Sequence, residues 1–161
     1  LMDDTPEGAF ERLRTARSAN VNHRRVHEMV GAEYGYSYAD SPLIDTPGDT
    51  QAEWDTVRFL PSTNPGVRIP HIWLSDKASI LDAMGPDFTF IDLTGSAAPS
   101  DIEDAFKQMD VPLKVFRRDE RHVRSVYGCR FLLVRPDLHI AWTGNCLPQD
   151  SNKLAKMVTG F

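Results

Sequence analysis

Short apolar runs of strand length alternate with helix start and stop signals through the last hundred residues, and this alternation constrains the fold most. Residues 79–85 run from a serine to a Gly-Pro stop, residues 100–103 have the Ser-x-x-Glu spacing of a capping box, and Ser151 is placed to cap a last helix. Too short for ordinary helices, the apolar runs are predicted strands. They lie at residues 69–74, 88–93, 113–116, 131–134 and 138–142.

The predicted order is strand, helix, strand, helix, strand, an unassigned segment, a hairpin around Pro136-Asp137 and a final helix. This is the element order of a thioredoxin-like domain. Its first half requires a right-handed crossover between parallel strands, and its hairpin half is antiparallel. We therefore expect an α/β fold, a thioredoxin-like mixed sheet flanked by helices and preceded by a helical and extended N-terminal arm.

The region before the predicted sheet has a different character. Residues 8–31 show an imperfect helical alternation that predicts one long helix or two short ones. Residues 41–65 are rich in Pro, Asp, Thr and Gly, which is typical of an arm or linker. We predict that residues 1–57 form this arm, the remnant of a preceding substrate domain plus a linker, and that residues 58–161 form the thioredoxin-like domain.

Composition excludes several classes of protein. A net charge of -5 opposes nucleic-acid binding. No apolar run approaches the roughly 18 to 20 residues of a membrane span. No signal peptide is evident, and because the chain starts at Leu1 we expect a carboxy-terminal fragment of a larger protein. Two cysteines, Cys129 and Cys146, are too few for a disulfide scaffold, so a cytoplasmic location is expected.

One local exception is a cluster of arginines, interrupted by Asp119 and Glu120. A solvated face is the favoured interpretation, with a docking surface for a partner domain or a phosphate as the alternative. The cluster consists of Arg117, Arg118, Arg121, Arg124 and Arg130.

No complete set of catalytic residues is found. Thiol exchange on this fold needs a cysteine after the strand at residues 88–93, and residues 94–100 contain none, so the Cys-x-x-Cys motif is lacking. His23 and His27 are spaced to share a metal, but two ligands are a weak signal and an ordinary polar face is favoured. Gly-x-Ser-x-Gly, dinucleotide-binding and Walker-type motifs are also lacking. We therefore assign no catalytic, cofactor-binding or metal-binding residue.

Three stretches together carry a family resemblance. Residues 65–74 have the pattern Pro-Gly-x-Arg-x-Pro-His-x-Trp-Leu, residues 79–89 have Ser-x-x-Asp-x-x-Gly-x-x-Phe-Thr, and residues 133–142 have Leu-Val-Arg-Pro-Asp-x-His-x-Ala-Trp. They resemble the carboxy-terminal region of FAD-dependent aromatic hydroxylases of the phenol hydroxylase type. The resemblance covers roughly residues 34–142.

The resemblance implies a last domain that has the thioredoxin-like fold without its redox cysteines. FAD, NAD(P)H and the phenol are then held mainly by upstream domains, so that the whole protein is a monooxygenase and this chain alone is inactive. The implied partners are the upstream FAD-binding and substrate domains and a second copy in a homodimer. The alternative is a stand-alone, redox-inactive thioredoxin-like interaction module.

Three side chains in the first stretch suit an interdomain contact. They combine a guanidinium fork, an imidazole and an amphipathic indole. A core or edge strand explains them equally well. They are Arg68, His71 and Trp73.

Overall fold

The computed structural model describes residues 4–46 and 54–161, without the side chains of residues 24–27. The described chain divides into two compact units, one with residues 4–36 and 54–60 and the other with residues 37–46 and 61–161. The predicted domain boundary at residue 57 stays a prediction. None of the described helices is both long enough and apolar enough to span a membrane.

The first unit contains α1 (Pro6–His27) and α2 (Val30–Tyr34). Since α1 has 22 residues and covers most of residues 8–31, the alternative of one long helix is the correct one, and α2 begins only at the end of that range. Proline occupies the first position of α1, and the Thr5 hydroxyl accepts a hydrogen bond from the Gly8 amide at 3.1 Å. Residues 54–58 pack tightly against α2. The Ala32 amide donates to the Thr56 carbonyl at 3.0 Å, and a Cβ on Gly31 would meet the Asp55 carbonyl oxygen at 1.8 Å.

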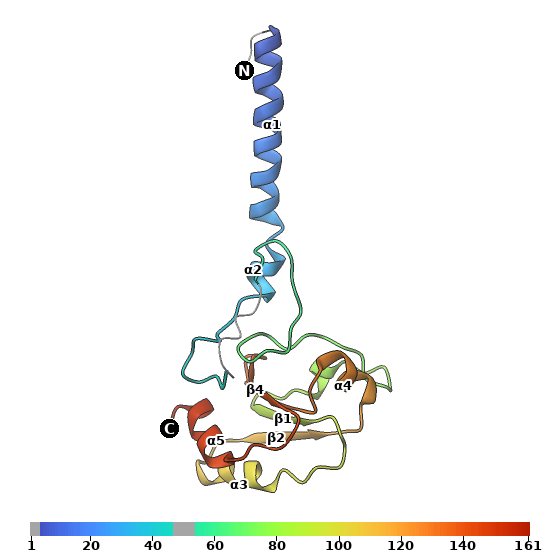
Figure 1. The fold of residues 1–161 in the computed structure, drawn as a ribbon, viewed down its shortest axis with the longest axis vertical. Helices are drawn as coiled ribbons and strands as arrows, with labels where there is room; N and C mark the ends of the chain where they lie inside the picture. Colours follow the sequence, from blue (N-terminus) through green and yellow to red (C-terminus); the bar gives the residue numbers. More distant parts are fainter. Residues whose placement is uncertain (1–3, 47–53) are drawn as a thin grey trace. The chain divides into compact units, whose positions relative to one another are not determined.

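The second unit is built on a mixed sheet of four strands within the described residues (Figure 1). Its order is β2-β1-β3-β4, with β1 parallel to β2, β3 antiparallel to β1, and β4 antiparallel to β3. This arrangement confirms the predicted thioredoxin-like sheet. The strands are β1 (Phe88–Asp92), β2 (Leu113–Arg117), β3 (Phe131–Val134) and β4 (Ile140–Gly144).

Helices cover both faces of this sheet. Phe90 of β1 faces α3 (Ser100–Gln108) and α5 (Ser151–Thr159), where it joins a buried cluster with Phe106. The next residue, Ile91, belongs to a second cluster with the short 3-10 helix η1 (Ile80–Ala83) and α4 (Arg121–Tyr127). Because successive side chains of a strand point to opposite faces, the short continuous apolar strands fill both layers of the core.

The strand predicted at residues 69–74 is wrong. That segment is extended but makes only isolated bridges, from Arg68 to His139 and from Trp73 to Ser79. Pro70 has no amide hydrogen to donate to a strand ladder. The hairpin is confirmed, although β4 begins at Ile140, because Leu138 lies in the turn with a φ of 67°.

Two predicted helix caps are also wrong. Ser100 is the first residue of α3 and Pro99 precedes it, with the Pro99 carbonyl accepting from the Ile102 and Glu103 amides. At α5 the cap is Asp150, whose carboxylate accepts from the Lys153 amide at 2.8 Å. The remaining cap, Ser79 of η1, forms the reciprocal pair of hydrogen bonds with Asp82.

The helices α3 and α5, of nine residues each, turn apolar side chains toward the core. Ile102, Ala105 and Phe106 of α3 are buried, as are Leu154 and Val158 of α5. Phe161 is the exception, since it is 77% exposed beyond the end of α5.

Candidate functional site

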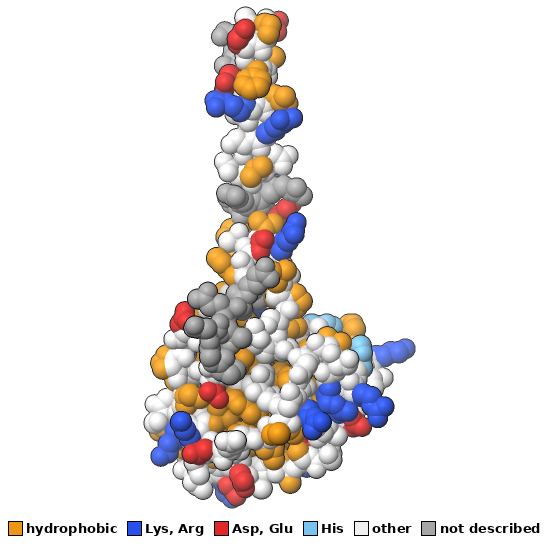
Figure 2. Space-filling view, viewed as in Figure 1, with side chains coloured by type: hydrophobic (Ala, Val, Ile, Leu, Met, Phe, Trp, Pro, Cys, Tyr) orange, Lys and Arg blue, Asp and Glu red, His pale blue; other side chains and the backbone are white. Residues whose placement is uncertain are grey.

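Basic side chains gather on one flank of the second unit, where β2 runs into α4 (Figure 2). The predicted interpretation as a simple solvated face is incomplete, because three of the arginines, Arg117, Arg118 and Arg124, are ion-paired. Arg118 bonds Asp76 at 2.9 Å and Arg124 bonds Asp119 at 2.6 Å. Arg124 also donates to the Leu93 carbonyl. These pairs attach α4 and the segment after β2 to neighbouring loops.

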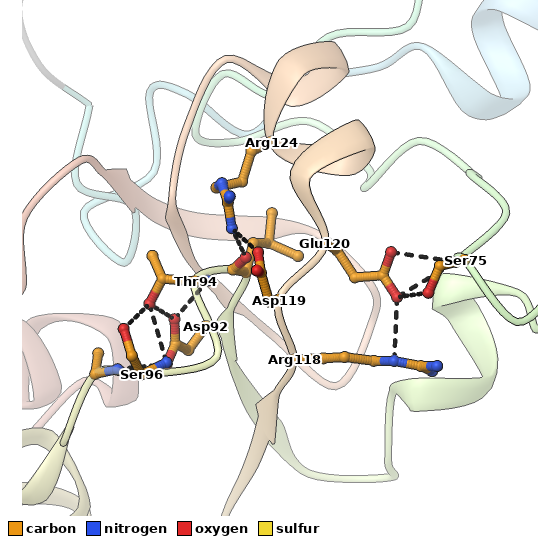
Figure 3. Close-up of polar contacts among 10 residues, drawn as sticks. Ser75, Asp92, Thr94, Ser96, Arg118, Asp119, Glu120 and Arg124 are labelled. Carbon is orange, nitrogen blue, oxygen red and sulfur yellow. Dashed lines mark hydrogen bonds and ion pairs between the residues drawn. The ribbon is translucent and has the colours of Figure 1, made fainter.

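A buried carboxylate, Glu120, lies between these arginines (Figure 3). It accepts hydrogen bonds from the Ser75 hydroxyl at 2.9 Å and the Ser75 amide at 3.1 Å, and the Arg118 Nε lies 3.1 Å away. Arg118 continues the network to Asp76. The pKa of Asp76 is lowered by a hydrogen bond from the Ala78 amide and then by Arg118. The turn at residues 75–76 is therefore tied to the start of α4.

A second buried carboxylate, Asp92, lies at the carboxyl end of β1. One of its oxygens accepts from the Thr94 hydroxyl at 2.6 Å and the Thr94 amide at 2.8 Å. The other accepts from the Ala97 amide at 3.0 Å and lies 3.6 Å from the Arg117 Nε. Asp92 therefore fixes the loop that follows β1 at two points, Thr94 and Ala97.

This loop occupies the place where thiol chemistry would require a cysteine on the fold. Gly95 has a φ of +71°, and a Cβ there would lie 2.6 Å from the Asp119 amide nitrogen. A bridge between Thr94 and Asp119 completes the packing. The hydroxyls of Thr94 and Ser96 lie 3.3 Å apart in this loop, and the carboxylate of Asp92 accepts hydrogen bonds from the backbone on either side of Ser96 (Figure 3).

The three residues predicted for an interdomain contact divide into a pair and a single residue. The rings of His71 and Trp73 meet edge to face, with centroids 4.6 Å apart. His71 is exposed and Trp73 is 61% exposed. Arg68 is half-buried, and its backbone bridges His139 instead. The structure therefore places an exposed aromatic pair next to the turn that Glu120 holds.

Histidines and acids provide little support for a metal site. Within the part of the chain that the structure describes, no group of three or more His, Cys, Asp or Glu side chains is placed to hold a metal ion. His139 is buried, and burial lowers its pKa. The predicted His23 and His27 pair includes a side chain that lies outside the described residues.

The two cysteines have different environments. Cys129 is buried, and burial raises its pKa to about 11, whereas Cys146 is exposed. At pH 8, only about a thousandth of a thiol with that pKa is ionised. Because the thiolate is the nucleophile, burial and a high pKa together make Cys129 inert.

We expect iodoacetamide at pH 8 to label Cys146 and to leave Cys129 unlabelled in the folded chain. Mass spectrometry of the labelled peptides gives the readout, with urea-unfolded protein as the control in which both thiols react. The variant Cys146→Ser should take up almost no label while folded. Rapid labelling of Cys129 in the native protein would contradict its inertness and would support thiol exchange as a function of this domain.

Comparison with known proteins independently supports the resemblance to aromatic hydroxylases. The model of the family "Aromatic-ring hydroxylase, C-terminal" matches residues 62–160. The chain is 32% identical to a phenol 2-monooxygenase from a Pseudomonas strain, covering 92% of this chain and 27% of that protein. It is 27% identical to the FAD-dependent monooxygenase opdD of Penicillium oxalicum, covering 88% and 28%.

The solved structure of the rebeccamycin biosynthetic enzyme RebC with reduced flavin is also similar. It matches with a TM-score of 0.74 and 31% identity, over 99% of this chain and 29% of that one. The chain thus spans less than a third of the length of the proteins it matches. Sheet order, sequence motifs and family model agree, and the chain belongs to the family of aromatic-ring hydroxylase C-terminal domains.

Proposed function

We propose that this chain is the carboxy-terminal domain of an FAD-dependent monooxygenase that hydroxylates a phenolic or other aromatic substrate with NAD(P)H and O2. The observation that carries the proposal is the family match over residues 62–160 together with relatives that are FAD-dependent and phenol monooxygenases. In that protein the upstream domains hold FAD, NAD(P)H and substrate. FAD supplies the oxygen-transfer chemistry when bound there.

Within such a protein, this domain contributes structure, dimerisation or closure of the substrate domain. The arrangement around Asp92 supports this role, because the loop after β1 is closed by hydrogen bonds to a buried carboxylate. Nothing in that loop is a nucleophile of the thiol type. A homodimer and a cytoplasmic location stay predictions.

The test is NAD(P)H oxidation stimulated by a phenol, measured on the full-length gene product and on the 161-residue chain. We expect phenol-dependent oxidation only with the full-length product. A full-length product that oxidises neither NADH nor NADPH with any of a panel of phenols would contradict the proposed activity.

The exposed aromatic pair is the proposed contact with the upstream domains of the same protein. An exposed indole in edge-to-face contact with an imidazole gives a large amphipathic contact area with few rotatable bonds. Arg68 is the least supported of the three predicted contact residues, since its backbone bridges His139 and not the turn that contains Trp73. The occupant that we infer is the flavin-binding and substrate region, because this chain covers only 28% and 27% of two monooxygenase relatives, and the remaining length must contain their FAD and phenol sites if this domain has none.

Three alanine variants of the full-length protein test this contact: Arg68→Ala, His71→Ala and Trp73→Ala. Trp73→Ala should increase cleavage by a protease between this domain and the rest, and should lower phenol-stimulated NAD(P)H oxidation. Arg68→Ala should have the smallest effect of the three. The contact is wrong if Trp73→Ala and His71→Ala both behave as the parent protein.

The second candidate function is a stand-alone, redox-inactive thioredoxin-like interaction module. The same exposed aromatic pair favours it, since that pair would then contact a separate protein. The size of the native gene product, seen on an immunoblot of cell extract, separates the two candidates. A product of about the present length would support the module, and one several times longer would support the monooxygenase domain.

A further inference from the structure

The exposed Trp73 lies on a short extended turn whose backbone is held at several points. Trp73 bridges Ser79, and the Leu74 amide donates to the Ala78 carbonyl at 2.8 Å. Leu74 is buried and anchors the turn in the core, while Lys77 adopts a φ of 69° at its tip. The indole therefore belongs to a turn whose two arms are bonded to each other.

Glu120 attaches this turn to the sheet-bearing core from a distant part of the sequence. It is 2% exposed, and both of its oxygens are directed to Ser75, two residues beyond Trp73. Arg118 bonds Glu120 (Figure 3). Arg118 also bonds Asp76, so two successive turn residues, Ser75 and Asp76, are held. The Glu120 amide in turn donates to the Leu93 carbonyl at 3.0 Å.

The direction of the Glu120 side chain is informative. Glu120 precedes the first residue of α4, where a carboxylate commonly accepts a hydrogen bond from the helix amides. It makes no such capping bond and instead extends to Ser75. A buried carboxylate requires close hydrogen-bonding partners, and here the partners are supplied by the turn next to the exposed indole.

We propose that Glu120 is a positioning residue for Trp73, holding the turn at residues 73–79 in the conformation that contacts the upstream domains. This inference rests on the proposed interdomain contact. Fixing a contact loop in advance reduces the conformational entropy lost when two surfaces meet, which strengthens the contact without adding atoms to it. Ser75 transmits the constraint through its amide and hydroxyl, and Arg118 through Asp76.

The first arm of the test measures the turn itself, in the 161-residue chain. Glu120→Gln keeps the side-chain shape but removes the charge that Arg118 and Ser75 bond. Because the Ser75 amide then bonds a neutral acceptor, we expect its hydrogen exchange to become about tenfold faster. A tenfold change corresponds to about 1.4 kcal/mol. Glu103→Gln makes the same chemical change on an exposed residue of α3 and should leave exchange at Ser75 unaltered. Ser75→Ala is a milder second variant that removes only the hydroxyl donor.

The second arm measures the contact, in the full-length protein. Like Trp73→Ala, Glu120→Gln should increase protease cleavage between this domain and the rest of the protein. The double variant Glu120→Gln with Trp73→Ala should be cleaved little more than Trp73→Ala alone. Glu103→Gln should again behave as the parent protein. This non-additivity separates positioning of Trp73 from a general loss of stability, which would add to the effect of Trp73→Ala.

The outcomes distinguish the two proposals. Unaltered exchange at Ser75 in Glu120→Gln overturns the positioning role, whatever Trp73→Ala does. Faster exchange at Ser75 with no effect of either Trp73→Ala or His71→Ala on the full-length protein overturns the interdomain contact and, with it, the role of Glu120 in docking. Faster exchange with matching, non-additive effects supports both.

Discussion

Gly95→Ala should lower the free energy of unfolding of this domain by about 3 kcal/mol or more. Gly95 has a φ of +71°, which an alanine adopts only at a cost, and the new Cβ would lie 2.6 Å from the Asp119 amide nitrogen. Because that neighbour is backbone, the segment that leads from β2 into α4 must shift to make room. Urea unfolding followed by circular dichroism measures the loss.

Gly128→Ala is the matched control for this prediction. Gly128 ends α4 with the same φ of +71°, but a Cβ there would meet nothing within 4 Å. We expect a loss of only about 1 kcal/mol, the cost of the left-handed conformation alone. Equal losses for the two variants would show that the loop after β1 is not packed against residues 118–119 as described.

Asp92→Ala should lower the free energy of unfolding by about 3 to 4 kcal/mol. The change removes the buried acceptor of the Thr94 and Ala97 amides and the partner of the Thr94 hydroxyl. A buried donor that loses its acceptor costs about 1 to 3 kcal/mol, and bonds to a charged group are the stronger ones. Thermal and urea unfolding of the purified variant give the value.

Asp104→Ala serves as the control for Asp92→Ala, because Asp104 is exposed on α3. Its loss should stay within about 0.5 kcal/mol, as is usual for surface substitutions. A loss for Asp92→Ala as small as that of Asp104→Ala would contradict the view that Asp92 fixes the loop where a reactive cysteine would be needed.

The strands could be predicted from sequence because their apolar runs are contiguous and short. Residues 88–93, 113–116 and 131–134 contain side chains for both faces of a covered sheet, and the structure has strands there. The sequence does not predict α4, since only Val123 and Tyr127 of its seven residues are buried and most of the others are polar or charged. A helix that buries apolar residues over a single turn shows almost no hydrophobic periodicity in its sequence.

The site was harder to predict than the fold. The lack of a cysteine in residues 94–100 is visible in the sequence, and so are two acids, Asp92 within a predicted strand and Glu120 among the arginines. Their partners are not visible: Glu120 bonds Ser75, which is 45 positions away. An acid between arginines usually indicates a solvated pair, whereas in the structure Glu120 is buried and bonded to the turn at residues 73–79 through Ser75.

The absorbance spectrum of purified protein after mixing with FAD and removal of free flavin tests the central claim most directly. The 161-residue chain and the full-length gene product are compared side by side. We predict that only the full-length product retains the flavin absorbance, because the upstream domains bind the cofactor. Stoichiometric flavin retained by the 161-residue chain alone would contradict the account of this chain as a domain without its own cofactor site.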